Sequence, residues 1–243
     1  MKQLLKAIAE RVLGPSSDDL YAVRARVAER YLTGAGVEFG ALHYALDVPK
    51  SVTVKYADMQ PIEQLRKSYP DIKDIRPPDF VTDLESMRGI DDSSMDFVIA
   101  NHVLEHVEDP LQALTSISRV LRPSGIAYIA LPDKRFTFDK SRAISPLAHL
   151  IMDHEQGPDW SLAGHYDEWC RCVDGLSGEA YKQKYAVMLA QRANIHFHVW
   201  DYSAMLELFS YVARMPEVNL QVELSLLNSI EVIWILRKAA GEA

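Results

Sequence analysis

Apolar positions along the chain change between the spacing typical of strands and the spacing typical of helices. Val52, Val54 and Tyr56 alternate with polar residues, which indicates a strand with one exposed face. Residues 95–100 form an almost continuous apolar run, as in a strand that is covered on both faces. The pattern predicts helices over 4–13, 18–31, 61–69 and 110–122, and strands over 36–39, 51–57, 80–81, 95–100 and 126–131.

The order of these elements predicts an α/β fold. Strands that alternate with helices form a mostly parallel sheet with helices on both faces, so we expect a doubly wound, Rossmann-like sheet. Near the C-terminus a further helix is predicted after Asp201, which is a good capping residue. Two strand-like runs follow over 219–226 and 231–236, and the short turn at Asn228 and Ser229 predicts that they pair as an antiparallel hairpin.

Residues 132–200 lack this rhythm and are rich in His, Trp, Tyr, Asp and Arg. An insertion at the carboxyl end of a strand lies where open α/β sheets bind ligands, so we expect this segment to form a cap over a substrate site. We therefore predict a single domain with N-terminal helices over 1–33, a cofactor-binding core over 34–131, the inserted cap over 132–200, and a C-terminal helix and strand pair over 201–243.

Composition narrows the class of protein. With 48% hydrophobic and 25% charged residues, the 243-residue chain is typical of a globular protein with a sizeable core. Its net charge of −8 disfavours binding to phosphate backbones, so no nucleic-acid partner is expected. No uncharged apolar run approaches the ~20 residues of a membrane span, and Lys6, Glu10 and Arg11 interrupt any secretory signal. We expect a cytoplasmic protein without a membrane partner. Cys170 and Cys172 are too close for an unstrained disulfide and too few for a zinc site.

Acidic residues stand at the predicted ends of three strands. Glu38 and Gly40 end the first strand, Asp58 follows the second, and Asp83 follows the third. In nucleotide-binding α/β folds the glycine lets a ligand approach the backbone, and the acid after the second strand accepts hydrogen bonds from a ribose. Asp83 could accept a hydrogen bond from an adenine amino group. The alternative interpretation is that these acids cap loops.

The glycine motif after the first strand is incomplete. A dinucleotide site needs G-x-G-x-x-G, whereas only Gly40 is present here, followed by Leu42 and Tyr44. This disfavours a nicotinamide-dependent oxidoreductase. S-adenosylmethionine carries no phosphate and needs less of this cradle, although side chains at positions 42 and 44 could crowd its amino-acid end and weaken binding.

Two runs of residues resemble a known family. DFVIANHVLEHVEDP over 96–110 resembles the fourth strand and following loop of class I S-adenosylmethionine-dependent methyltransferases, and VLRPSGI over 120–126 resembles their turn into the fifth strand. The run PDKRFTFD over 132–139 is similar to one bacterial branch of that family. The resemblance implies that fold, S-adenosylmethionine as cofactor, and the cofactor-binding residues Glu38, Phe39, Gly40, Ala41, Asp58, Met59, Asp83, Leu84, Asn101 and His102.

Histidines supply the candidate catalytic residues. A hydroxyl nucleophile benefits from a base that titrates near neutral pH, and His106 and His165 are the predicted catalytic residues. The alternative for His106 is a buried histidine that bonds to the backbone. The cap also carries metal-capable residues without a tight signature such as H-E-x-x-H, so no metal is expected: His149, Asp153, His154, His196 and His198.

These observations predict methyl transfer from S-adenosylmethionine to a hydroxyl or amine of a polar small molecule or sugar. Trp160 and Tyr166 would line the substrate pocket. The basic run of Lys134, Arg135, Lys140 and Arg142 is either a solvated loop or a grip on an anionic substrate group. The alternative function is a non-catalytic or repurposed methyltransferase-fold subunit that binds or assembles. The oligomeric state is not predicted.

Overall fold

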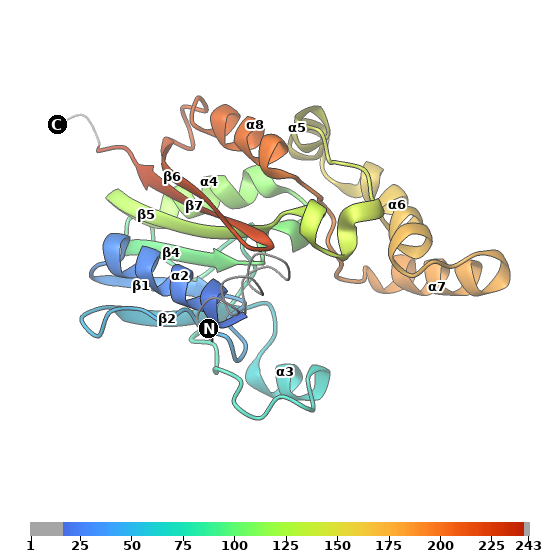
Figure 1. Cartoon of the computed structure of the whole chain (residues 1–243), viewed down its shortest axis with the longest axis horizontal. Coiled ribbons are helices and arrows are strands. Elements are labelled where there is room, and N and C mark those ends of the chain that lie inside the picture. The colour runs from blue at the N-terminus through green and yellow to red at the C-terminus, as the bar shows by residue number, and fades with distance from the viewer. Residues whose placement is uncertain (1–16, 241–243) are drawn as a thin grey trace, which may run out of the picture.

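A computed structural model describes residues 17–240 of the chain, so the helix predicted over residues 4–13 lies outside the described residues. Seven strands form one sheet in the order β3-β2-β1-β4-β5-β7-β6 (Figure 1). The strands are β1 (Ala35–Phe39), β2 (Thr53–Asp58), β3 (Phe80–Val81), β4 (Met95–Asn101), β5 (Leu121–Pro132), β6 (Leu220–Asn228) and β7 (Glu231–Lys238).

The strand pairing confirms the predicted fold class. Strands β1 to β5 pair in parallel, whereas β7 pairs antiparallel with both β5 and β6. Strand β7 therefore lies between β5 and β6 rather than at an edge. The turn of the hairpin falls at Ser229 and Ile230, one residue later than predicted, because Asn228 still pairs with Glu231.

The helices are α2 (Ser17–Tyr31), α3 (Ile62–Ser68), α4 (Pro110–Val120), α5 (Leu147–Gln156), α6 (Asp159–Glu168), α7 (Gly178–Gln191) and α8 (Tyr202–Val212). The predicted caps of α4 and α8 are confirmed. Asp109 accepts a hydrogen bond from the Gln112 amide, and Asp201 accepts one from the Ala204 amide, which satisfies amides left free at each helix start.

The boundary between α4 and β5 differs from the prediction. We predicted that the helix runs to the Pro123–Gly125 turn, but it ends at Val120 and β5 begins at Leu121. Arg122 precedes a proline, which disfavours the helical conformation, and Leu121 pairs with Met95 of β4. The register between β4 and β5 then shifts between Met95 and Phe97, which accommodates the extra residues of β5 between Leu121 and Ile126.

The hydrophobic core lies on both faces of the sheet. Along β4 the side chains alternate, so that Val98 and Ala100 join one cluster of buried residues and Phe97 and Ile99 join another. Helices α4 and α8 pack into the first cluster and α2 packs into the second, so α2 covers the face opposite to α4 (Figure 1). Both faces of the central strands are therefore buried, as their continuous apolar sequence predicted.

Residues 133–200 form the insertion after β5, which we call the cap. Asp133 and Trp200 form an isolated bridge where the chain leaves the sheet and returns to it. Helices α6 and α7 of the cap project beyond the end of the sheet (Figure 1). The sequence predicted no regular elements here, whereas the structure has three α-helices. Helix α7 buries only Met188, so its sequence has no apolar stripe from which the helix could be predicted.

Among the described residues, no helix combines the length and apolar character needed to cross a membrane. Both cysteines are free, with Cys170 buried and Cys172 exposed.

Candidate functional site

Three predicted cofactor residues form a row at the carboxyl edge of the sheet. Phe39 of β1 pairs with Ala57 of β2 on one side and with Ala100 of β4 on the other. The residues that follow them, Gly40, Asp58 and Asn101, therefore lie side by side at the strand ends. Ligands of open α/β sheets bind outside this edge, so the row is a candidate binding site.

Gly40 brings the backbone close to the next strand. Its φ is +65°, and a Cβ at this position would lie 3.0 Å from a methyl group of Val103. Its amide donates a hydrogen bond to the Ala57 carbonyl. A side chain here would be strained and would cover the row, so glycine keeps the backbone open to a ligand.

Glu38 ties down the loop that follows Gly40. Its buried carboxylate accepts a hydrogen bond from the Leu46 amide at 2.9 Å. Burial raises the pKa of Glu38 to about 7, against the lowering effects of that hydrogen bond and of the Arg24 and Arg76 charges. The loop therefore rests on a carboxyl group that titrates near neutral pH.

Asp58 offers a carboxylate at the end of β2. One oxygen accepts a hydrogen bond from the Gln60 amide at 3.1 Å, and no side chain among the described residues bonds to it. Burial raises the pKa of Asp58 above its usual range, although the Gln60 and Met59 amides oppose the shift. The spare acceptor capacity suits the two hydroxyls of a ribose.

The other predicted cofactor-binding residues do not offer free side-chain groups in the way that Asp58 and Asn101 do. The Asp83 carboxylate accepts hydrogen bonds from the amide and the hydroxyl of Ser86, so it caps a turn, as the alternative interpretation predicted. The side chains of Phe39, Ala41 and Leu84 are buried. Met59 is 65% exposed.

Asn101 has an unpaired side-chain amide at the row. Both polar atoms of its side-chain amide are buried and have no hydrogen-bond partner among the described residues. Buried polar side chains are normally bonded, and leaving one unpaired costs about 1–3 kcal/mol per group. A polar ligand at the row would satisfy this amide, so the residues present fit the polar amino-acid part of S-adenosylmethionine.

His102 follows Asn101 and is held by two buried acids. Its Nε2 lies 2.8 Å from Glu231 and its Nδ1 lies 3.5 Å from Glu105. Glu231 also pairs with Arg24 through both of its oxygens. Burial lowers the pKa of His102, but the hydrogen bond to Glu231 and the two carboxylate charges outweigh burial and raise it.

His106 occupies a short turn after β4, facing the cap. Its Nδ1 lies 2.8 Å from the Asn194 side-chain oxygen and 3.0 Å from the Ile195 carbonyl oxygen. Both partners are acceptors, so Nδ1 carries the proton and Nε2 has a free lone pair. Burial lowers the pKa of His106, reinforced by the nearby His196. The backbone contact matches the structural alternative, and the free Nε2 leaves a role as base open.

His165 lies elsewhere in the cap. Its Nε2 is 3.2 Å from Nε2 of His149, and its ring also contacts His198 edge to face. Burial and the His149 charge lower the pKa of His165 to about 4. The two predicted catalytic histidines therefore belong to different clusters, and a catalytic role for His165 stays a prediction.

Two buried acids near these histidines are not among the site residues predicted from the sequence. Glu105 is fully buried, neither of its carboxylate oxygens has a hydrogen-bond partner among the described residues, and it lies beside His106 and His196. Glu231 is equally buried and holds His102. Glu105 stands between His102 and His106 in the sequence, so its closeness to a histidine could have been predicted, whereas no local pattern pairs Glu231 with His102.

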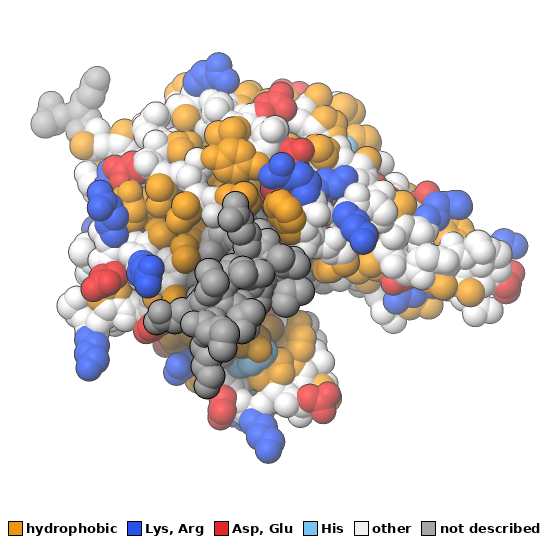
Figure 2. Space-filling model, viewed as in Figure 1, with side chains coloured by type: hydrophobic (Ala, Val, Ile, Leu, Met, Phe, Trp, Pro, Cys, Tyr) orange, Lys and Arg blue, Asp and Glu red, His pale blue; other side chains and the backbone are white. Residues whose placement is uncertain are grey.

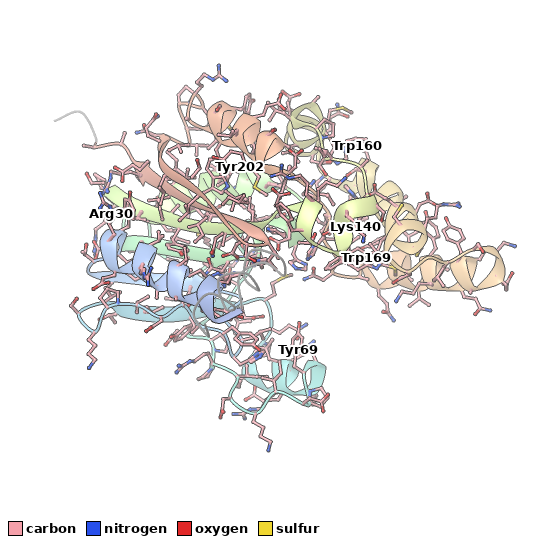
Figure 3. The ribbon with its side chains drawn as sticks, in the orientation of Figure 1. Arg30, Tyr69, Lys140, Trp160, Trp169 and Tyr202 are labelled. Carbon is pink, nitrogen blue, oxygen red and sulfur yellow. The ribbon has the colours of Figure 1, made fainter. Side chains whose placement is uncertain are left out.

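The basic run at 134–142 is mostly engaged within the protein. Arg135 pairs with Asp133, Arg142 pairs with Asp139 and Glu168, and the Lys134 ammonium donates to the Arg142 carbonyl. Lys140 lies at the surface beside the cap helix that carries Trp169 (Figure 3). On the face drawn in Figure 2, basic, acidic and apolar side chains are interspersed, which differs from the uniform basic surface of nucleic-acid-binding proteins.

Leu42 and Tyr44 occupy the two positions at which the glycine motif is incomplete. Leu42 has a φ of +45°, so it keeps a backbone conformation that favours glycine. Tyr44 is 59% exposed and stacks against Tyr21 with ring centroids 5.7 Å apart. The loop therefore retains the shape that a glycine would take, with a leucine side chain added to it.

Comparison with known proteins finds a match for the core of the chain. Residues 33–129 match a family model described as a methyltransferase domain. Over 117 residues the chain is 31% identical to an uncharacterized 37.1 kDa protein in transposon TN4556 of Streptomyces fradiae. That match covers 47% of this chain and 33% of the relative, so the chain aligns with about a third of the curated relative's length.

Solved structures share the whole architecture. A protein described as a methyltransferase, in complex with a methyltransferase activator from Haloferax volcanii, has a TM-score of 0.51 and 14% identity, covering 98% of this chain and 97% of that one. A Rhodobacter sphaeroides protein described among Zn-dependent alcohol dehydrogenases has a TM-score of 0.57 and 16% identity, covering 93% and 91%. At these identities the likeness shows the fold alone.

Proposed function

We propose that this chain methylates a hydroxyl or amine of a polar small molecule or sugar. The proposal is supported by the match of residues 33–129 to a family model described as a methyltransferase domain and by the sheet order, which is that of a class I, S-adenosylmethionine-dependent methyltransferase fold. The row of Gly40, Asp58 and Asn101 carries the proposal, since it combines an open backbone, a free carboxylate and an unpaired amide at the carboxyl edge. The antiparallel β7 between β5 and β6 also differs from the dinucleotide-binding order 3-2-1-4-5-6.

Each residue of the row has a proposed role in binding the cofactor. Asp58 would accept hydrogen bonds from the ribose hydroxyls, and the Asn101 amide would bond the methionine part. Gly40 would let the ligand reach the backbone between β1 and β4. The bound cofactor supplies a methyl group already activated on a positively charged sulfur, so the protein must chiefly position the acceptor and exclude water.

His106 is the proposed general base. With its proton on Nδ1, it would accept the proton of the acceptor hydroxyl or amine at Nε2. Because its pKa is lowered, the ring is neutral at physiological pH and adds no positive charge beside a sulfonium. The cap, which contacts this ring through Asn194, Ile195 and His196, would hold it in place and shield the reaction from water.

A binding subunit without catalysis is the second candidate. Leu42 in a glycine-like conformation favours it, because the side chain could obstruct the amino-acid end of the cofactor. Calorimetry of the purified protein with S-adenosylmethionine and S-adenosylhomocysteine separates the two candidates. The methyltransferase proposal expects micromolar affinity, about −8 kcal/mol. No detectable binding at millimolar cofactor would favour the subunit.

Replacing Asp58 with alanine should weaken cofactor binding by more than about 1.5 kcal/mol, or roughly tenfold, because two ribose hydroxyls lose a charged acceptor. The dissociation constant is measured by calorimetry, with circular dichroism to check the fold. Asp71→Ala, which removes an exposed acid after α3, is the control and should bind as the wild type does. Equal affinity in the Asp58 variant would remove this residue from the cofactor site.

A further inference from the structure

Four side chains of the cap converge on one point. His149 and Asp153 come from α5, His165 comes from α6, and His198 comes from the segment that returns to the sheet. One potential ligand atom of each residue lies within 4.8 Å of those of the other three. The spacing of four residues puts His149 and Asp153 on the same side of α5, facing α6.

Hydrogen bonding within the group accounts for only part of this arrangement. Asp153 is fully buried, and its Oδ2 has no hydrogen-bond partner among the described residues. Nε2 of His149 and Nε2 of His165 face each other at 3.2 Å, so at most one proton can lie between them. The group therefore places a carboxylate oxygen without a hydrogen-bond partner next to three ring nitrogens that can act as metal ligands.

The distances fit a tetrahedral metal. Zinc lies about 2.0–2.2 Å from nitrogen and carboxylate ligands, which puts the ligands of a tetrahedral site roughly 3.3–3.5 Å apart. His149 Nε2 lies 3.1 Å from Asp153 Oδ2 and 3.2 Å from His165 Nε2, and His198 Nε2 lies 3.9 Å from Asp153 Oδ2. We propose that His149, Asp153, His165 and His198 bind a zinc ion.

The surroundings of Asp153 are suited to this role, whereas His198 must exchange a contact. The Ser161 hydroxyl donates to Asp153 Oδ1 at 2.8 Å, which orients the carboxylate and leaves Oδ2 for the metal. His198 Nε2 also lies 3.2 Å from the Glu108 carbonyl oxygen. Zinc binding would replace that contact and place the ring proton on Nδ1, which has no acceptor among the described residues, a cost that the metal bond must exceed.

The ion has a structural role. Four protein ligands close a zinc site and leave no position for substrate, unlike catalytic sites with three. The cap's own hydrophobic cluster has only six buried residues, so a metal crosslink supplies stability that this small core lacks. It joins α5, whose Leu150 packs into the main core, to α6 and to the segment carrying His196, which contacts His106.

Metal analysis of the full-length, tag-free protein tests the proposal. After expression with added zinc and dialysis, mass spectrometry should find about one zinc per chain in the wild type. The His149→Ala/His165→Ala double variant should retain less than about a tenth of that, because half of the ligands are gone. His154→Ala is the matched control: this residue of α5 bonds to Asp109 instead, and the variant should keep its zinc.

Cobalt titration of the wild type provides a readout that does not depend on whether any variant folds. Wild-type apoprotein should give the strong visible absorption of tetrahedral Co²⁺, saturating at one equivalent, and Asp153→Asn should lose it while keeping the side-chain volume. Zinc should raise the Tm of the wild type but not of Asp153→Asn. A zinc-free wild type that gives no cobalt absorption, or full zinc retention in the double variant, would overturn the proposal.

Discussion

Replacing Glu231 with glutamine lowers the free energy of unfolding by about 3 kcal/mol near pH 6, because it leaves two cationic side chains without their buried partner. Glu231 is fully buried at the start of β7 and accepts hydrogen bonds from Arg24 at 2.9 Å, from His102 at 2.8 Å and from the side-chain amide of Asn228 at 2.8 Å. Glutamine preserves the volume, so the loss reports the charge and not a cavity.

The effect depends on pH in a defined window. Burial opposes the charged form of Glu231, but Arg24 and His102 outweigh it and lower the pKa of Glu231 to about 2. Its contribution is complete above the ordinary glutamate pKa of 4.5 and disappears as the pH falls towards 2. The pKa of His102 is raised above 6.5, so its contribution is complete below 6.5 and disappears as the pH rises through the raised value. The wild type and the variant should differ most between pH 4.5 and 6.5.

Chemical denaturation across this pH range measures the difference. Glu223→Gln is the matched control, since Glu223 pairs with Arg237 on the neighbouring surface with its side chain 34% exposed. Exposed pairs contribute about 0–1 kcal/mol, so the control should change stability little. If Glu231→Gln proves as mild as the control, the Arg24–Glu231–His102 network does not stabilise the fold.

The central sheet could be predicted because burial determines its sequence. Residues 95–100 are apolar on both faces, and the structure buries both faces of β4. The caps at Asp109 and Asp201 were predictable because capping depends on local hydrogen bonds. The cap helices were not predictable, because α7 packs through few buried residues and therefore lacks an apolar stripe.

The candidate site likewise contains residues that the sequence predicts and residues that only the folded chain brings together. The row of Gly40, Asp58 and Asn101 follows from strand ends, and parallel pairing brings strand ends together. Arg24 and Glu231 are 207 residues apart in the chain, so no local pattern pairs them. The four proposed zinc ligands likewise meet only through the packing of α5, α6 and the returning segment, and no motif in the sequence predicts a metal there.

Replacing His106 with asparagine lowers turnover about a hundredfold or more, because general-base catalysis typically contributes 10²–10⁴-fold. The asparagine amide nitrogen can take the place of Nδ1, so it can still donate to the Asn194 side chain and the Ile195 carbonyl that hold the histidine. The substitution therefore removes Nε2 while preserving the structural contact. Turnover is measured on the acceptor substrate, and the affinity for S-adenosylmethionine should stay within about threefold, under ~0.7 kcal/mol.

The pH profile separates a base from a positioning residue. The pKa of His106 lies below 6.5, so the wild-type rate should be level at neutral pH and fall as the pH drops through that lowered pKa. His106→Asn should lose this acidic limb together with the rate, whereas a residue that only anchors the cap would leave the limb unchanged. A wild-type rate in His106→Asn would show that the contacts to Asn194 and Ile195 are the whole role of this residue. A joint loss of rate and cofactor affinity would instead place His106 in the cofactor site, because a base for the acceptor proton does not act until the cofactor is already bound.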